Sequence, residues 1–367
     1  MNANLINENS IVSNLINIYE RFGFKKIKLS KFEDYNLYNN NKDFLQTEHI
    51  LTFMNSNGNL KSLRPDVTLS IVKKILKDND RETQKIYYIE DIYKIVSNEY
   101  EEIPQVGVEI VGKLNKYSNL EIISMAIESL KSINENYILE ISNIDFISAI
   151  FDEVGIKENL KIEILKNIYE KNKHDLEKLL DKNIKSEYKK YILSLIELSG
   201  NYKDILKKLK TLIINDTLQK SYDELKSLSA VFEMHNNFDK ILLDFSIESK
   251  LGYYNGIIFK GYIKENNDII LSGGRYDKLL NKFNSDKNAI GFAIYMDKLY
   301  EKNASSDFID ILILYKSGDE KILLNEVRKF MNENKKVRVD IYGDNSTNNY
   351  KEKYIFDKNN LIIERKK

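Results

Sequence analysis

The segment Gln105-Val106-Gly107-Val108-Glu109-Ile110 alternates polar or small residues with apolar ones. Successive side chains of a strand point to opposite faces, so Gln105, Gly107 and Glu109 share one face. On that face the glycine leaves room, the carboxylate can hold an ammonium group, and the amide can bond a polar side chain. The pattern indicates either a small polar pocket or a solvent-exposed strand face, and half-polar strands of the second kind are common.

Three other segments carry residue types that can build such a pocket. The first is Leu63-Arg64-Pro65-Asp66-Val67-Thr68, in which Arg64 can serve a ligand or a buried ion pair. The second is the tyrosine pair within 251–256, and the third is Ser272-Gly273-Gly274-Arg275-Tyr276-Asp277, followed by Gly-Phe-Ala at 291–293. Because the chain has 24 tyrosines, core packing is the ordinary alternative for any one of them. The Gly-Gly pair can equally mark a tight exit from a strand.

The elements that must position these residues follow from hydrophobic periodicity and turn signals. We predict α+β architecture with mainly antiparallel strands, flanking helices and a helical insertion at about 156–235. A polar stretch at 303–306 predicts a linker, which divides the chain into a core of 1–303 and a small α/β domain of 307–367. The predicted helices are 8–23, 66–77, 119–132, 275–283, 292–302 and 319–333. The predicted strands are 24–31, the region 42–63 around an Asn-Gly turn, 86–93, 104–111, 137–141, 240–245, 256–263, 268–271, 308–315, 337–342 and 353–364.

Taken together, these motifs resemble the catalytic core of histidyl-tRNA synthetases, which are class II synthetases. In that family a strand with the spacing Gln-x-Gly-x-Glu contacts the bound histidine, an acidic residue and a threonine bind its amino group, and tyrosines wall the imidazole pocket. Val67 stands where the family has a glycine. The resemblance implies a histidine-binding set of Asp66, Thr68, Gln105, Glu109, Tyr253, Tyr254 and Tyr276. It also implies a class II synthetase-like antiparallel sheet.

The positions that handle ATP in that family differ here. Its arginines are matched by Lys94, Ser249 and Lys298, and a glycine is replaced by Tyr295, whose ring we expect where adenine would lie. Lysine keeps the charge but loses the planar fork of arginine. The loop expected at 96–104 has no basic residue and carries three glutamates, which would repel a triphosphate. We therefore expect no adenylation chemistry.

A synthetase-like core without adenylation chemistry resembles the ATP phosphoribosyltransferase regulatory subunits. The resemblance covers residues 1 to about 300, is weaker over 157–235, and is only architectural over 307–367. It implies a subunit with no activity and no cofactor of its own, which pairs with a short catalytic subunit in the first step of histidine biosynthesis. It further implies feedback inhibition through L-histidine as effector, and a homodimer within a hetero-octamer.

Two other functions remain open at this point. One is a divergent histidyl-tRNA synthetase, which the missing arginines oppose. The other is a synthetase-like binding module of another pathway or of an RNA, supported by 14 lysines against 9 acidic residues over 155–210. Charged helices usually just face solvent.

Composition narrows the class of protein. With 56 basic and 56 acidic residues the net charge is zero, which argues against a nucleic-acid partner because phosphate contacts need a basic field. The chain has no cysteine and only three histidines, so disulfides are excluded and no zinc site is expected. There is no signal-peptide pattern and no apolar run of about 20 residues. We expect a cytoplasmic protein without a membrane partner.

Overall fold

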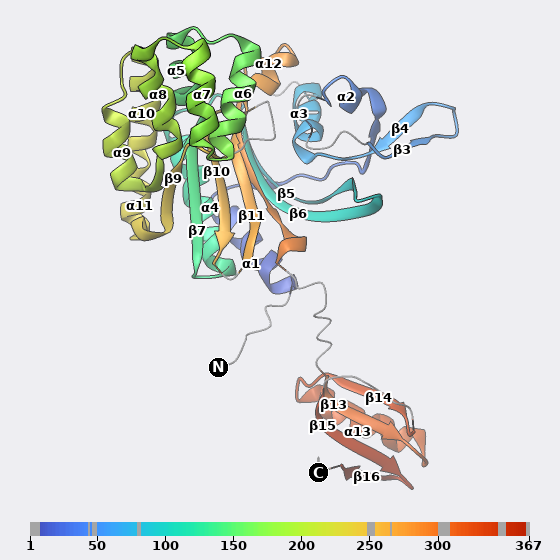
Figure 1. The fold of residues 1–367 in the computed structure, drawn as a ribbon. Helices are drawn as coiled ribbons and strands as arrows, with labels where there is room; N and C mark the ends of the chain where they lie inside the picture. The colour runs from blue at the N-terminus through green and yellow to red at the C-terminus, as the bar shows by residue number, and fades with distance from the viewer. Residues whose placement is uncertain are drawn as a thin grey trace. The chain divides into compact units, whose positions relative to one another are not determined.

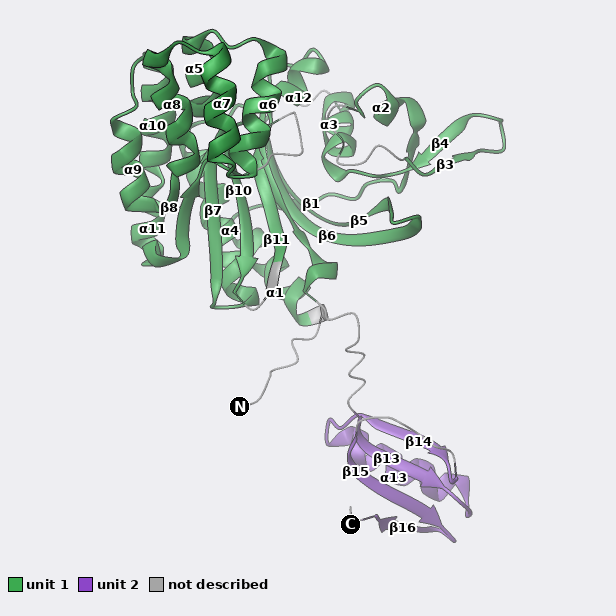
Figure 2. Cartoon of the chain, in the orientation of Figure 1, with its two compact units in different colours: residues 1–299 green, residues 300–367 purple. Residues whose placement is uncertain are grey.

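The computed structural model describes residues 8–42, 45, 50–78, 82–247, 254–264, 266–299, 309–343 and 350–364. The chain divides into two compact units, Met1–Leu299 and Tyr300–Lys367 (Figure 2). Among the described residues, no helix is long and apolar enough to cross a membrane.

The first unit contains a nine-stranded sheet (Figure 1). Its strands, in spatial order, are β1 (Lys25–Lys26), β5 (Gln84–Val96), β6 (Glu99–Gly112), β12 (Asn288–Tyr295), β11 (Asn266–Arg275), β10 (Asn255–Ile263), β7 (Tyr137–Asn143), β9 (Ile241–Asp244) and β8 (Ser199–Asn201). The β1–β5 and β7–β9 pairs are parallel and the other pairs are antiparallel. The predicted α+β architecture is therefore observed, with a mixed rather than a purely antiparallel sheet.

Helices cover both faces of this sheet. On one face, α1 (Glu8–Arg21) and α4 (Lys116–Ile133) pack together, and Tyr19 of α1 contacts the rings of Tyr87 and Phe292. On the other face lie α2 (Tyr35–Asn39), α3 (Val67–Lys77) and α12 (Asp277–Lys282), around one apolar cluster. Close to α2 and α3 is a small sheet in the order β2 (Phe32–Asp34), β4 (Leu60–Leu63), β3 (Thr52–Met54).

The predicted helical insertion is a run of helices that starts earlier than expected. It comprises α5 (Ile144–Val154), α6 (Glu158–Tyr169), α7 (Lys173–Asn183), α8 (Ser186–Glu197), α9 (Tyr202–Lys210), α10 (Asp216–Ser227) and α11 (Ser229–His235). The short strand β8 interrupts the run and pairs with β9 at the edge of the large sheet. We call residues 144–235 the helical segment.

Three local predictions were wrong. Residues 292–302 were expected to be helical, but β12 runs through Asn288–Tyr295 and only Met296–Lys298 form a short 3-10 helix. The strand is largely buried on both faces, so it shows no two-residue alternation that would distinguish it from a helix. The expected loop at 96–104 is the end of the β5–β6 hairpin, with a turn at Ser97 and Asn98 in left-handed conformation. The strand expected at 24–31 is reduced to β1.

The second unit is a small α/β domain. It contains β13 (Ile309–Tyr315), α13 (Glu320–Asn332), β14 (Val337–Ile341), β15 (Tyr350–Asp357) and β16 (Asn360–Ile363), in the sheet order β14-β13-β15-β16. Its core gathers Ile311, Ile313, Leu323 and Phe356. The linker predicted at 303–306 lies outside the described residues.

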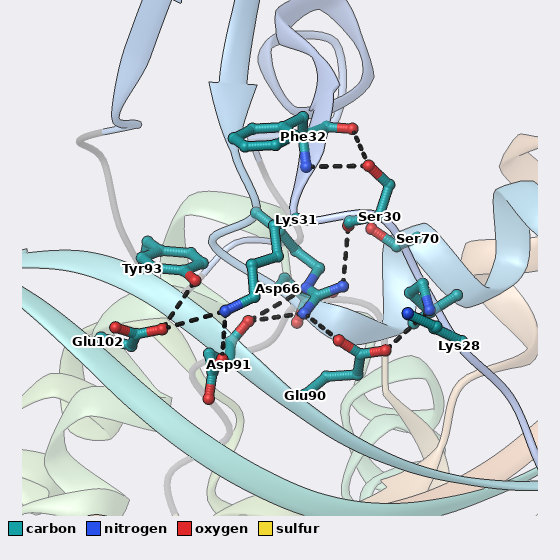
Figure 3. A network of polar contacts seen from close by, with 12 residues as sticks. Lys28, Ser30, Lys31, Phe32, Asp66, Ser70, Glu90, Asp91, Tyr93 and Glu102 are labelled. Atoms are coloured by element: carbon teal, nitrogen blue, oxygen red, sulfur yellow. Dashed lines mark hydrogen bonds and ion pairs between the residues drawn. The ribbon is translucent and has the colours of Figure 1, made fainter.

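Arg64 holds the start of α3 against β5. Its fully buried guanidinium pairs with Glu90 at 2.9 Å and donates to the backbone carbonyls of Ser30 and Asp91. Nearby, Lys31 pairs with Asp91 at 2.8 Å and with Glu102 at 3.4 Å (Figure 3). The structure thus assigns Arg64 to a buried ion pair, which fixes the backbone immediately before Asp66.

We predict that Arg64→Met lowers the free energy of unfolding by about 3–5 kcal/mol, because it leaves the Glu90 carboxylate buried without its partner. Adding Glu90→Gln to this variant should restore part of the loss. Urea denaturation measures both. Lys61→Met, which breaks a more exposed pair with Asp34, is the control and should cost much less. Equal losses for Arg64→Met and Lys61→Met would contradict this role.

Candidate functional site

A pocket lies on the face of the large sheet that carries α3, and it contains most of the residues predicted from the sequence. Asp66, Thr68, Gln105, Glu109, Tyr254 and Tyr276 all line it. Tyr253 lies outside the described residues. The cavity volume is about 40 Å³, which is room for a few water molecules at most. An amino acid would therefore enter only if the lining moved.

Strand register brings the pocket floor together. Gln105, Gly107 and Glu109 of β6 are directly opposite Tyr295, Ala293 and Gly291 of β12. On the other side, Tyr88 of β5 is the partner of Gly107. Directly opposite residues share a face of the sheet. Gln105 and Glu109 are only 6% and 2% exposed, so this face lines a polar pocket and is not a solvent-exposed surface.

Two glycines make the space that the floor needs. A Cβ atom at Gly291 would overlap the Glu109 carboxylate, and one at Gly107 would overlap the ring of Tyr88. Neither glycine has a positive φ, so backbone conformation does not require glycine here. The close approach of neighbouring atoms does. The carboxylate then reaches the hydroxyl of Tyr276, which donates a hydrogen bond of 2.8 Å to Oε2.

Asp66 enters the pocket from the N-terminus of α3. It is the N-cap residue, and its side chain accepts the backbone N–H of Leu69 at 2.8 Å. An aspartate at this place satisfies an otherwise unpaired donor and is favoured by the helix dipole. The anchored backbone at Arg64 and the cap of α3 together set the position of this second carboxylate.

Both pocket carboxyl groups are harder to ionise than usual. The pKa of Glu109 is raised to about 8, chiefly by burial and to a smaller extent by the nearby Asp66, although hydrogen bonds from Tyr276 and Thr68 oppose the rise. Burial also raises the pKa of Asp66, whereas the hydrogen bond from the Leu69 N–H and the positive charge of Lys94 lower it. At neutral pH Glu109 is mostly a neutral acid that an approaching cation would ionise.

Sequence reasoning missed part of the lining. Tyr88 lines the pocket, as do Ser272 of the Gly-Gly segment and two residues at the replaced ATP positions, Lys94 and Tyr295. The signal for Tyr88 was Gly107, because a glycine in a central strand leaves space for a side chain of the neighbouring strand. Lys298 instead pairs with Asp297 at 3.4 Å and is half-exposed, and Ser249 lies outside the described residues.

Comparison with known proteins relates this site to one group of proteins. Residues 3–299 match the family model described as histidyl-tRNA synthetase. An ATP phosphoribosyltransferase regulatory subunit from Clostridium botulinum (strain Langeland) is 33% identical over 350 residues, covering 90% of this chain and 81% of that protein.

Solved structures give the same result for the fold. An ATP phosphoribosyltransferase regulatory subunit/histidyl-tRNA synthetase from Bacillus halodurans has a TM-score of 0.77 at 22% identity, covering 93% of this chain and 90% of that one. The ATP phosphoribosyl transferase (HisG:HisZ) complex from Thermotoga maritima has a TM-score of 0.62 at 21% identity, covering 79% of this chain and 97% of that one. These likenesses confirm the predicted class II synthetase-like fold.

The raised pKa of Glu109 predicts a pH dependence of stability. Between pH 4.5 and about 8 the folded protein keeps a proton that the unfolded chain loses, so the free energy of unfolding falls as pH rises through this window. Glu109→Gln should remove this loss, so the variant gains stability relative to the parent between pH 5 and pH 8. Urea denaturation at several pH values measures the difference. Glu99→Gln, at an exposed position, should show no such gain.

Proposed function

The chain belongs to the ATP phosphoribosyltransferase regulatory subunit family, and from this premise we propose how it works. It is a non-catalytic subunit that binds and activates a short-form ATP phosphoribosyltransferase catalytic subunit, which joins ATP to phosphoribosyl pyrophosphate. L-Histidine, the product of the pathway that this reaction opens, binds in the pocket of Glu109 and Asp66 and inhibits the complex. The solved structure from Thermotoga maritima is described as a HisG:HisZ complex, which supports a partner of this kind.

The observation that carries the proposal is the buried carboxyl of Glu109, bonded to Tyr276 beside a second carboxyl. A carboxylate in a dry site attracts an ammonium group strongly once both are desolvated. We assign the α-ammonium of histidine to Glu109 and Asp66, with Thr68 beside them. Gln105 orients the ligand, and Tyr254 and Tyr276, together with Tyr253, enclose the imidazole ring.

The ATP side of the site supports a non-catalytic role. Transfer of an adenylyl group needs cations that hold the phosphates through the transition state. Of the matching positions, Lys94 lies close enough to Asp66 to lower its pKa, and Lys298 pairs with Asp297. Tyr295 takes a place in the pocket lining. This arrangement favours a sensor over an amino-acid-activating enzyme.

The small volume of the cavity supplies a reason why histidine binding would be coupled to a conformational change. A ligand shifts a conformational equilibrium only by its difference in affinity for the two states. A pocket of about 40 Å³ has no room for histidine, so histidine would bind a state in which the lining has moved. A homodimer within a hetero-octamer would transmit that change to the catalytic subunits, with a typical coupling of about 1–3 kcal/mol.

The first test adds the purified chain to a short-form catalytic subunit and follows phosphoribosyl-ATP formation with and without histidine. We expect activation that histidine reverses. Activation without sensitivity to histidine would retain the partner and reject the sensor. Absence of activation, together with histidine-dependent exchange of pyrophosphate into ATP, would instead indicate a synthetase.

A second prediction concerns Glu109 itself. Glu109→Ala should abolish inhibition by histidine and leave activation of the catalytic subunit largely intact, because the pocket carboxyl contacts the effector and not the substrates. The same assay measures both effects. Glu99→Ala provides a control at an exposed position of the same strand. Inhibition of the Glu109→Ala complex at the usual histidine concentration would contradict the assignment.

Binding should also release a proton. An ammonium beside Glu109 stabilises the ionised carboxylate, so a group that is mostly protonated at pH 7 loses about one proton when histidine binds. Affinity should therefore rise from pH 7 to pH 8, where the imidazole of histidine is already neutral. Titration calorimetry in buffers of different ionisation enthalpy measures the release. Glu109→Gln should bind weakly and release no proton, and equal release from the parent and this variant would contradict the prediction.

A further inference from the structure

Asp277 ties together three strands at the edge of the pocket. Its Oδ2 accepts hydrogen bonds from Arg275 Nε at 2.7 Å and from Asn255 Nδ2 at 3.2 Å. Its Oδ1 accepts the backbone N–H of Ala289 at 3.0 Å. Arg275 ends β11, Asn255 begins β10 and Ala289 belongs to β12. One carboxylate therefore fixes the ends of three neighbouring strands relative to one another.

Two of the pocket tyrosines, Tyr254 and Tyr276, are chain neighbours of these bonded residues. Tyr276 stands between Arg275 and Asp277, its N–H donates to the Ala289 carbonyl at 2.9 Å, and its hydroxyl reaches Glu109. Tyr254 precedes Asn255 and lies so close to Gly274 that a Cβ atom there would come within 2.9 Å of its ring. The bonds of Asp277 thus hold the residues next to both tyrosines in the chain.

The helical segment contacts this arrangement through Glu224 of α10. The carboxylate accepts bonds from Asn119 at 2.6 Å and from Asn143 at 2.7 Å, and the positive charge of Arg275 lowers its pKa against the effect of burial. A Cβ atom at Gly256 would lie 3.4 Å from Arg275 Cδ and 3.7 Å from Glu224 Oε2, so both side chains lie beside this glycine. Arg275 is therefore bonded to Asp277 and lies within the electrostatic reach of Glu224.

Resting on the function proposed above, we propose that Glu224 and Asp277 are positioning residues that act on the pocket through Arg275. Through them, the position of the helical segment sets the position of Tyr254 and Tyr276, and so sets the affinity of the pocket for its ammonium-bearing ligand. Glu224 and Arg275 also line a cavity of about 800 Å³ bordered by α4, α5 and α10. This space leaves room for the Glu224 side chain to move. We call the path from Glu224 through Arg275 to Tyr254 and Tyr276 the relay.

Histidine titration calorimetry on the full chain tests the relay. Glu224→Gln should weaken histidine binding by about fivefold or more, the lower end of usual coupling between sites. Asp223→Asn is the matched control, because Asp223 is the exposed neighbour on the same helix and lines the same cavity. It should leave the affinity unchanged. An equal loss in both variants would overturn the proposal.

A double-mutant cycle separates the relay from a general loss of structure. Glu224→Gln and Tyr276→Phe should be non-additive in histidine affinity, since both act on the contact between Tyr276 and Glu109. Additive effects would overturn the proposal, because distant residues without a shared contact normally add.

A readout without histidine distinguishes this proposal from the function on which it rests. The Tyr276 hydrogen bond lowers the pKa of Glu109, so loosening Tyr276 in Glu224→Gln should extend the loss of stability to higher pH. The titratable groups lining the pocket with Glu109 are Asp66, Tyr88, Lys94, Tyr254, Tyr276 and Tyr295, and Glu224→Gln alters none of them. Burial raises the pKa of Glu224 as well, so the variant also removes the loss of stability that Glu224 itself causes as pH rises, and only an extension of the loss to higher pH reports on Tyr276. If the parent chain fails to bind histidine, the proposed function fails and this extension alone decides the relay. A profile without the extension would overturn it.

Discussion

The burial of one carboxyl group at the centre of the large sheet governs the site. An isolated charge there would cost several kcal/mol, and the usual response of a protein is to neutralise the group or to bond it. Both responses are present, since the pKa of Glu109 is raised to about 8 and Tyr276 donates to it. Gly291 provides the space in which this is possible. The Glu109 carboxyl group is therefore stable in its neutral form, and it would ionise when a nearby cation stabilises the carboxylate in place of water.

The two sides of the pocket are held by different forces. The floor belongs to β6 and β12, where a continuous ladder of backbone hydrogen bonds fixes each residue. Asp66 is equally constrained, by the cap of α3 and by the buried Arg64–Glu90 pair next to it. The side formed by Tyr254 and Tyr276 depends more on individual side-chain hydrogen bonds, chiefly those of Asp277. A change in the shape of the pocket is therefore easier at Tyr254 and Tyr276 than on the floor.

Local pattern was enough to place much of this site, but contacts between distant strands were not readable from it. The alternation at 105–110 located the strand, and the aspartate before an apolar helical run located the start of α3. Tyr88 was missed because only the register of β5 against β6 shows which side chain fills the space over Gly107. The error at 292–302 has a similar origin, since a strand largely buried on both faces carries no periodic signal. The acidic residues at 99–102 were placed in a loop because the extension of the hairpin comes from pairing with β5.

The close approach between Gly291 and Glu109 has a consequence for how such proteins can diverge. Any side chain at 291 would occupy the place of the carboxylate, so the glycine cannot be exchanged while the glutamate is present. Loss of the glutamate would not remove the whole barrier, because the new Cβ atom would still overlap the backbone carbonyl oxygen of Val108. A descendant that has lost the glutamate would therefore still keep the glycine, whose place is set by the packing of β12 against β6. Of this pair of positions on adjacent strands, only the glutamate is free to record a change in the use of the pocket.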